Sequence, residues 1–294
     1  MKNEIAKKYS IEKKEVKNNK IITFSQYILP LLFILTNLPL SLGNIILYNS
    51  RSLLSNTEIT ITIKGEGKQT FLNTKQTKIN NINYAFPYRP SEILVNGELV
   101  ANTLSYVEGL VGEENNITII FNETIDNCNV MFSGLSNILR IKFENFDSSQ
   151  VTNMKGMFKD CTSLISLDLN DLNTNAVEDM SQLFYNCKSL ESLEINNFTT
   201  TKVKNMNEMF FGCNKLTSLN IESFDTSSVT SMDRLFRNCS TLAEIAINNM
   251  NTSLVENMDE MCFGCKSLLS LNLSKFDTSS VTSMKSMFHD CSSL

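Results

Sequence analysis

The sequence predicts an α/β solenoid, in which each repeat contributes one short parallel strand and one short helix. The first observation is a strict period of 26 residues, marked by one cysteine per repeat: Cys161, Cys187, Cys213, Cys239, Cys265 and Cys291. A valine and a methionine recur with the same period, beginning at Val151 and Met154. A fixed period between about 20 and 50 residues is typical of solenoids, whose units bury their apolar faces against their neighbours.

The helix is expected between the valine and the cysteine of each repeat. After Val151, apolar residues follow at Met154, Met157, Phe158 and Cys161. On a helix that turns about 100° per residue, these positions lie in one stripe. An Asp, Asn or Gly precedes each cysteine. These residue types tolerate the left-handed conformation in which helices often end.

The strand is expected after the cysteine. Leu167 and Leu169 alternate with Ser166 and Asp168, which is the period of a strand with one buried face. Strands from successive repeats should pair in parallel and form a narrow sheet. Each strand is followed by an apolar residue and then by Asp, Asn, Ser or Thr, residues that form Asx and ST turns.

Residues 1–50 are expected to be a basic N-terminus plus a signal peptide or signal anchor. Residues 1–20 carry seven lysines against three glutamates, and residues 21–50 carry no charge. The apolar run at 28–48 is long enough to span a bilayer, which takes about 20 residues. The pattern places the rest of the chain outside the cell or at the cell surface, with the membrane as a partner if the segment stays uncleaved.

Residues 51–124 are expected to form a small β-rich capping domain. The run at 58–63 alternates strictly, and Asn96-Gly97 lies between two apolar runs, which indicates a hairpin. Such a domain would cover the open face of the first repeat. A separate ligand-binding module is the alternative for this segment.

Residues 125–294 are expected to form the solenoid, with a degenerate first repeat and a truncated last repeat. In the first repeat, Ile125 replaces the valine, Cys128 the methionine and Leu135 the cysteine. Terminal repeats are atypical because one of their sides meets something other than a copy. The last repeat stops at Leu294, where its strand should begin.

The repeat resembles that of the BspA-like leucine-rich-repeat surface proteins. The run 224–232, followed by Phe236 and Cys239, carries this resemblance, which extends over about 131–294. The resemblance implies a leucine-rich-repeat-like solenoid, exposure on the cell surface and an adhesive role toward host or matrix proteins.

No catalytic, cofactor-binding or metal-ligating constellation is evident, and we expect a protein that is not an enzyme. The single histidine, His289, occupies a variable position that Arg237 holds in an earlier repeat. Cys262 and Cys265 form a C-x-x-C pair, but Cys262 replaces the phenylalanine of the repeat and no second pair lies nearby. Buried, unbridged thiols are therefore expected rather than metal or redox chemistry.

The expected function is non-enzymatic binding of another macromolecule, a protein or a glycan, through the outward strand positions. Solenoids offer extended surfaces rather than closed pockets. The net charge of −5 and the lack of a basic stripe argue against nucleic-acid binding. The alternative is a structural spacer or coat, with function in the β domain or in a further C-terminal region. The expected binding face comprises Ser166, Asp168, Ser192, Glu194, Ser218, Asn220, Glu244, Ala246, Ser270 and Asn272.

Overall fold

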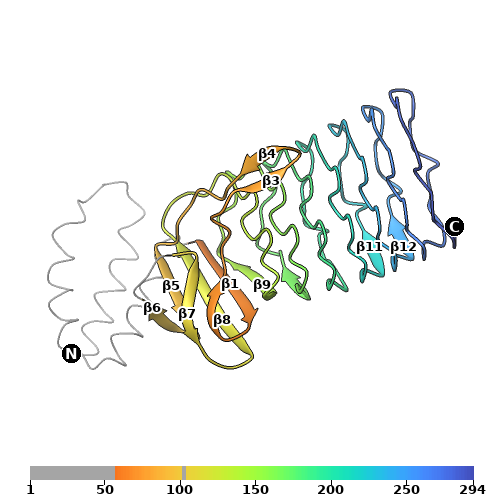
Figure 1. Cartoon of the computed structure of the whole chain (residues 1–294). Helices are drawn as coiled ribbons and strands as arrows, with labels where there is room; N and C mark the ends of the chain where they lie inside the picture. Colours follow the sequence, from red (N-terminus) through yellow and green to blue (C-terminus); the bar gives the residue numbers. More distant parts are fainter. Residues whose placement is uncertain (1–56, 101–103) are drawn as a thin grey trace, which may run out of the picture. The chain divides into compact units, whose positions relative to one another are not determined.

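The computed structural model describes residues 57–100 and 104–294, in which all regular elements are β-strands (Figure 1). Strands β1 to β8 make up a segment that we call the β unit, and β9 to β12 lie in the repeats. Their bounds are β1 Thr57–Lys64, β2 Gly67–Thr70, β3 Thr77–Ile79, β4 Ile82–Tyr84, β5 Glu92–Val95, β6 Glu98–Val100, β7 Tyr106–Leu110, β8 Glu114–Phe121, β9 Ile138–Glu144, β10 Ser166–Asp168, β11 Ser218–Asn220 and β12 Glu244–Ala246.

The β unit is built on β1, whose alternating sequence buries Ile59, Ile61 and Ile63 completely. It pairs antiparallel with β8 on one side and with β9 on the other, within a sheet of order β10-β9-β1-β8-β5-β6. The hairpin expected at Asn96-Gly97 is confirmed: it joins β5 to β6, and both residues have positive φ, 49° and 86°. One sheet therefore contains strands from both sides of residue 124.

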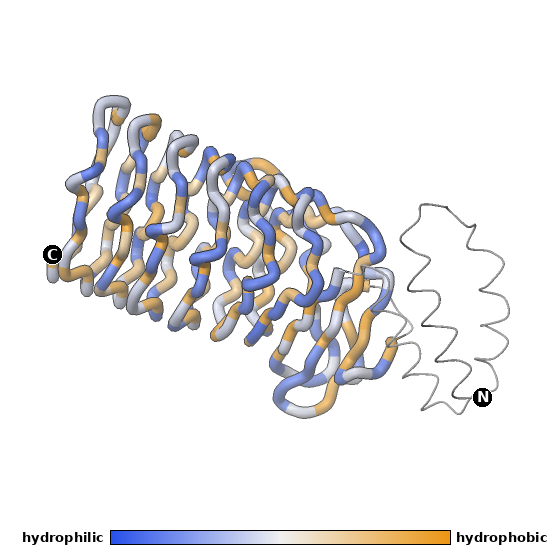
Figure 2. The backbone as a smooth tube through the Cα atoms, turned by 180° about the vertical axis from the view of Figure 1, so that it is seen from behind, coloured by the Kyte–Doolittle hydropathy of each residue, from blue (hydrophilic) through white to orange (hydrophobic). Residues whose placement is uncertain are grey.

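The repeats stack on one another with the 26-residue step that the sequence shows, and polar and apolar segments alternate along each of them (Figure 2). Isolated parallel bridges connect equivalent residues of successive repeats, from Asn127 and Asn153 to Asn257 and Ser283. Alternate amides then donate to the next repeat. Gly156 N lies 2.9 Å from the oxygen of Ser181, for example.

The predicted helix does not form, because the backbone of this stretch is bonded in two directions. Odd-numbered amides of the Val151 repeat donate three residues back, as Met157 does to Met154 at 3.1 Å. Even-numbered amides donate to the neighbouring repeat, so no run of bonds four residues back can develop. Gly156 and Asp160 both have a φ of +59°, which interrupts any right-handed helix.

The expected α/β leucine-rich-repeat-like solenoid is therefore wrong. The described residues contain no helix, and the expected strand is a three-residue element in only some repeats, at β10, β11 and β12. The equivalent segments 192–194 and 270–272 have no assigned strand. Apolar residues at three- and four-residue spacing suit a helix and two consecutive turns equally, and only contact with neighbouring repeats decides between them.

The core consists of columns in which each repeat contributes the same residue type. Val229, Met232, Phe236 and Cys239 are each 0% exposed, and their counterparts in the three preceding repeats are at most 1% exposed. Each cysteine of the column also has a polar partner. The Cys239 thiol donates to the oxygen of Phe210 at 3.0 Å, in the preceding repeat. The thiol thereby gives the buried carbonyl of Phe210 a second hydrogen-bond donor.

Buried threonines form a second polar column between repeats. Thr226 is 1% exposed, and its hydroxyl donates to the oxygen of Asn251 at 2.8 Å. Thr252 does the same to Asp277 at 2.9 Å and also accepts the Asp277 amide at 2.7 Å. Because the partner always belongs to the next repeat, these hydroxyls fix the spacing between neighbouring turns.

All eight cysteines, which lie within the described residues, are unbridged, and seven of them are buried. Burial raises the pKa of the Cys213 thiol to about 12, from the ordinary 9.0. Burial is also the first cause of the raised pKa of Cys187 and Cys239. The folded chain therefore holds these thiols in their neutral form.

Core substitutions should be costly in a middle repeat and mild in the last one. Met232 is 0% exposed and Met284 is 48% exposed, although both hold the same repeat position. We expect Met232→Ala to lower the free energy of unfolding by about 2–5 kcal/mol, because a buried cavity is left. Met284→Ala should cost about 1 kcal/mol or less. Urea unfolding of the two variants measures this, and equal costs would contradict the packing described.

Stability should fall at alkaline pH because of the buried thiols. The Cys213 thiol is protonated when folded and ionises near its ordinary pKa of 9.0 when unfolded, so the stability that it contributes is complete below about pH 9 and is lost as the pH rises toward about 12. The expected slope is about 1.4 kcal/mol per pH unit for each such thiol. Cys213→Ala should show a shallower alkaline decline than the parent chain in urea titrations. An unchanged slope would argue against burial of this thiol.

Candidate functional site

The ten residues of the expected binding face all lie on solvent-accessible positions of the strand side. Eight are exposed, while Asp168 and Ala246 are half-buried. Several of their polar groups already serve the local backbone. Asn220 accepts the amide of Glu222 at 3.0 Å, and Asn272 accepts that of Ser274 at 3.0 Å. The face therefore presents small polar side chains and carboxylates, with no aromatic or cationic member.

A different surface column carries large side chains. It occupies the position eight residues after each repeat valine, and we call it the aromatic–cation column. Five members are half-buried and His289 is exposed. The column comprises Lys159, Tyr185, Phe211, Arg237, Phe263 and His289.

Neighbouring members of this column are stacked on one another. The rings of Tyr185 and Phe211 lie 4.5 Å apart at an angle of 10°, and those of Phe263 and His289 lie 4.9 Å apart at 7°. Arg237 lies between the two pairs, with its guanidinium carbon 5.9 Å from the Phe211 ring and 4.3 Å from the Phe263 ring. Such cation–π contacts contribute about 0.5–2 kcal/mol each.

The first member extends the stack with a lysine. Lys159 Nζ lies 3.3 Å from the centre of the Tyr185 ring. Burial lowers the pKa of Lys159, and burial also raises the pKa of the Tyr185 hydroxyl. This part of the column is largely shielded from water, since the Lys159 side chain is only 13% exposed.

A second column runs beside the aromatic one, five residues after each repeat valine, and its members Glu208, Arg234 and Glu260 are charged. Arg234 donates through Nε to Glu260 at 2.7 Å and lies 3.6 Å from Glu208. Gln182 donates to the same Glu208 from the other side. Arg237 also pairs with Glu260, so the two columns meet there. Hydrogen bonds from Arg237 and Arg234 lower the pKa of Glu260.

Sequence reasoning missed this column because it treated the position of Arg237 and His289 as a variable solvated one. The available signal was compositional. From Lys159 onward every repeat places an aromatic ring or a cation there. Tyr and Arg are enriched among the residues that dominate protein interfaces.

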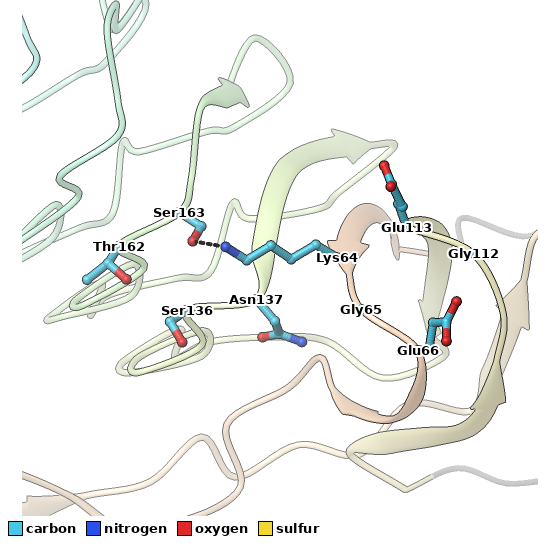
Figure 3. A pocket seen from close by; sticks show the side chains of 9 residues that line it. All are labelled: Lys64, Gly65, Glu66, Gly112, Glu113, Ser136, Asn137, Thr162 and Ser163. Atoms are coloured by element: carbon cyan, nitrogen blue, oxygen red, sulfur yellow. Dashed lines mark hydrogen bonds between the residues drawn. The ribbon is translucent and has the colours of Figure 1, made fainter.

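A wide groove lies where the β unit meets the first repeats (Figure 3). It has a volume of about 710 Å³ and is lined by two turns of the β unit and by the turns at Ser136-Asn137 and Thr162-Ser163. Lys64 crosses it and donates to the Ser163 hydroxyl at 2.7 Å. Glu66 and Glu113 supply carboxylates. The lining contains no aromatic side chain.

The described part of the chain contains no group of three or more His, Cys, Asp or Glu side chains arranged to hold a metal ion. None of its segments is a helix that could cross a membrane. The signal peptide or signal anchor expected at residues 1–50 lies outside the described residues.

One family model matches the chain, at residues 108–219 and again at 211–294. Its description is "Mycoplasma protein of unknown function, DUF285". The expected membership of the BspA-like leucine-rich-repeat family is therefore wrong. The apolar spacing that carried the resemblance is what stacking of 26-residue units requires in general, so it did not distinguish the two families. No curated protein and no solved structure matches the chain. Since the two matches together cover more than half of the 294 residues, the chain belongs to the family of Mycoplasma proteins of unknown function, DUF285.

Proposed function

We propose that the repeats form a non-enzymatic binding surface for another macromolecule, and that the aromatic–cation column is its principal contact. The observation that carries the proposal is a row of half-buried Tyr, Phe and Arg side chains at the same surface position of successive repeats. Interfaces derive most of their binding energy from a few such residues. The outward strand positions named from the sequence are the second candidate for the contact surface.

The chemistry of the column favours a protein partner over a glycan or a nucleic acid. Sugars and bases stack on ring faces, but the facing sides of Tyr185 and Phe211 are already covered by each other. The ring edges and the guanidinium of Arg237 remain available to a partner. Ring edges carry partial positive charge. Carbonyl and carboxylate oxygens of a protein surface suit both groups.

A location at the cell surface or outside the cell forms part of the proposal, and its support is the charge pattern of residues 1–50 alone. The rival function is that of a structural spacer. One observation favours it: the rings and charges of the two columns are largely used to connect successive repeats.

Two double variants in the same pair of repeats separate these functions. Tyr185→Ser with Phe211→Ser removes the ring pair from the column. Ser192→Lys with Ser218→Lys alters the strand side of the same two repeats. The full chain and both variants are tested on an array of immobilised proteins and on a glycan array. We expect binding to a protein target that falls roughly tenfold or more in the ring variant and changes little in the lysine variant.

The opposite pattern would place the contact on the strand side and overturn the assignment to the column. Binding that neither variant alters would support the spacer role of the repeats. Binding on the glycan array alone would refute a protein partner. Urea unfolding of both variants is needed beside the arrays, because the ring pair also contributes to stability.

A further inference from the structure

The buried phenylalanine column is interrupted at one place in the described repeats. Its rings stack parallel with centroid distances of 5.8, 5.7, 5.6 and 5.7 Å. The stacked members are Phe132, Phe158, Phe184, Phe210 and Phe236. The next repeat places Cys262 at this position, so its core contains two cysteines where each preceding repeat from Val151 onward contains one.

Cys262 and Cys265 are held close together by a turn. The amide of Cys265 donates to the oxygen of Cys262 at 3.1 Å. A turn closed by such a bond brings its end Cα atoms within about 7 Å, and disulfides span Cα distances of about 4.4–6.8 Å. Both side chains are 0% exposed and belong to the buried core.

The cysteine column offers no comparable pair between repeats. Cys239 and Cys265 are stacked copies of one position, and their thiols point the same way, toward the oxygens of Phe210 and Phe236. Parallel side chains do not converge as a disulfide requires. The turn that joins Cys262 to Cys265 therefore suits bridging better than the stacked cysteines of the column do.

We propose that Cys262 and Cys265 form a reversible dithiol–disulfide site that exchanges with small-molecule disulfides. One cysteine thiolate attacks the small disulfide, forms a mixed disulfide and releases the first small thiolate. The second cysteine thiolate then attacks the protein sulfur of the mixed disulfide and releases the second small thiolate. The two cysteine protons pass to the two leaving thiolates, so one disulfide is reduced as one is formed.

Access to the pair depends on the repeat that covers it. In the Val281 repeat, Met284 is 48% exposed, and Val281 and Phe288 are only half-buried. Few buried contacts hold such a segment, so its local opening costs little free energy compared with global unfolding. Opening of this one repeat uncovers Cys262 and Cys265 while the middle repeats stay closed. This site is independent of the proposed binding function.

The test equilibrates the full chain with glutathione disulfide under native conditions, then blocks free thiols and maps the peptides by mass spectrometry. We expect a mass loss of about 2 Da, assigned to one bridge between Cys262 and Cys265 and reversed by reduced glutathione. Cys262→Ser should lower the bridged fraction at least roughly tenfold. Eight free thiols after equilibration, or a bridge between Cys265 and Cys291, would overturn the proposal.

Two matched variants keep the result independent of folding defects. Cys262→Phe restores the residue that the preceding repeats carry, and it should abolish the bridge in a chain that still unfolds cooperatively. Phe236→Cys places the same pair one repeat earlier, beside Cys239. If the C-x-x-C spacing is sufficient for bridging and access limits the rate, the engineered pair should oxidise more slowly than Cys262 and Cys265. The reason is that the repeat that covers the engineered pair is itself fully buried. Faster oxidation of the second pair would contradict the role of the Val281 repeat.

Discussion

The structure depends on backbone hydrogen bonds between successive repeats. In each turn segment, alternate amides donate to the oxygen of a residue 25 positions further along the chain, while the amides between them close local turns. No repeat can satisfy its own backbone, so a single unit has no stable fold of its own. The geometry of these bonds also requires positive φ at two positions, which Gly156 and Asp160 occupy in the Val151 repeat. The bonds therefore dictate both the stacking and the conformation of the turns.

The buried columns follow from this constraint. When equivalent residues of successive repeats lie directly beside each other, each side chain meets a copy of itself or a close substitute. Aromatic rings stack, threonine hydroxyls reach the next backbone, and cysteine thiols reach the previous one. Cysteine fits its position because it is small, apolar and still able to donate one weak hydrogen bond. Its regular recurrence is thereby explained without catalysis or metal binding.

The same constraint applies at the surface, where it produces the aromatic–cation column and its charged neighbour. A surface side chain that meets copies of itself suffers repulsion if it is charged, and stacking is favourable if it is aromatic. Repulsion between like charges is avoided because the residue types alternate along each column. Arg237 lies between two aromatic rings, and Arg234 lies between two glutamates. Contacts that hold the repeats together therefore also define these two surface columns.

The sequence by itself determined the 26-residue step, the buried residue types, the alternating strand β1 and the hairpin at Asn96-Gly97, because each depends on local pattern or local turn chemistry. It did not determine the conformation between the valine and the cysteine. Apolar spacing there suits a helix, and the choice of turns comes from hydrogen bonds to repeats that are 26 residues away. The stacking within the aromatic–cation column likewise appeared only in the tertiary structure. Stacking distance and side-chain direction, rather than residue type, decide which groups meet.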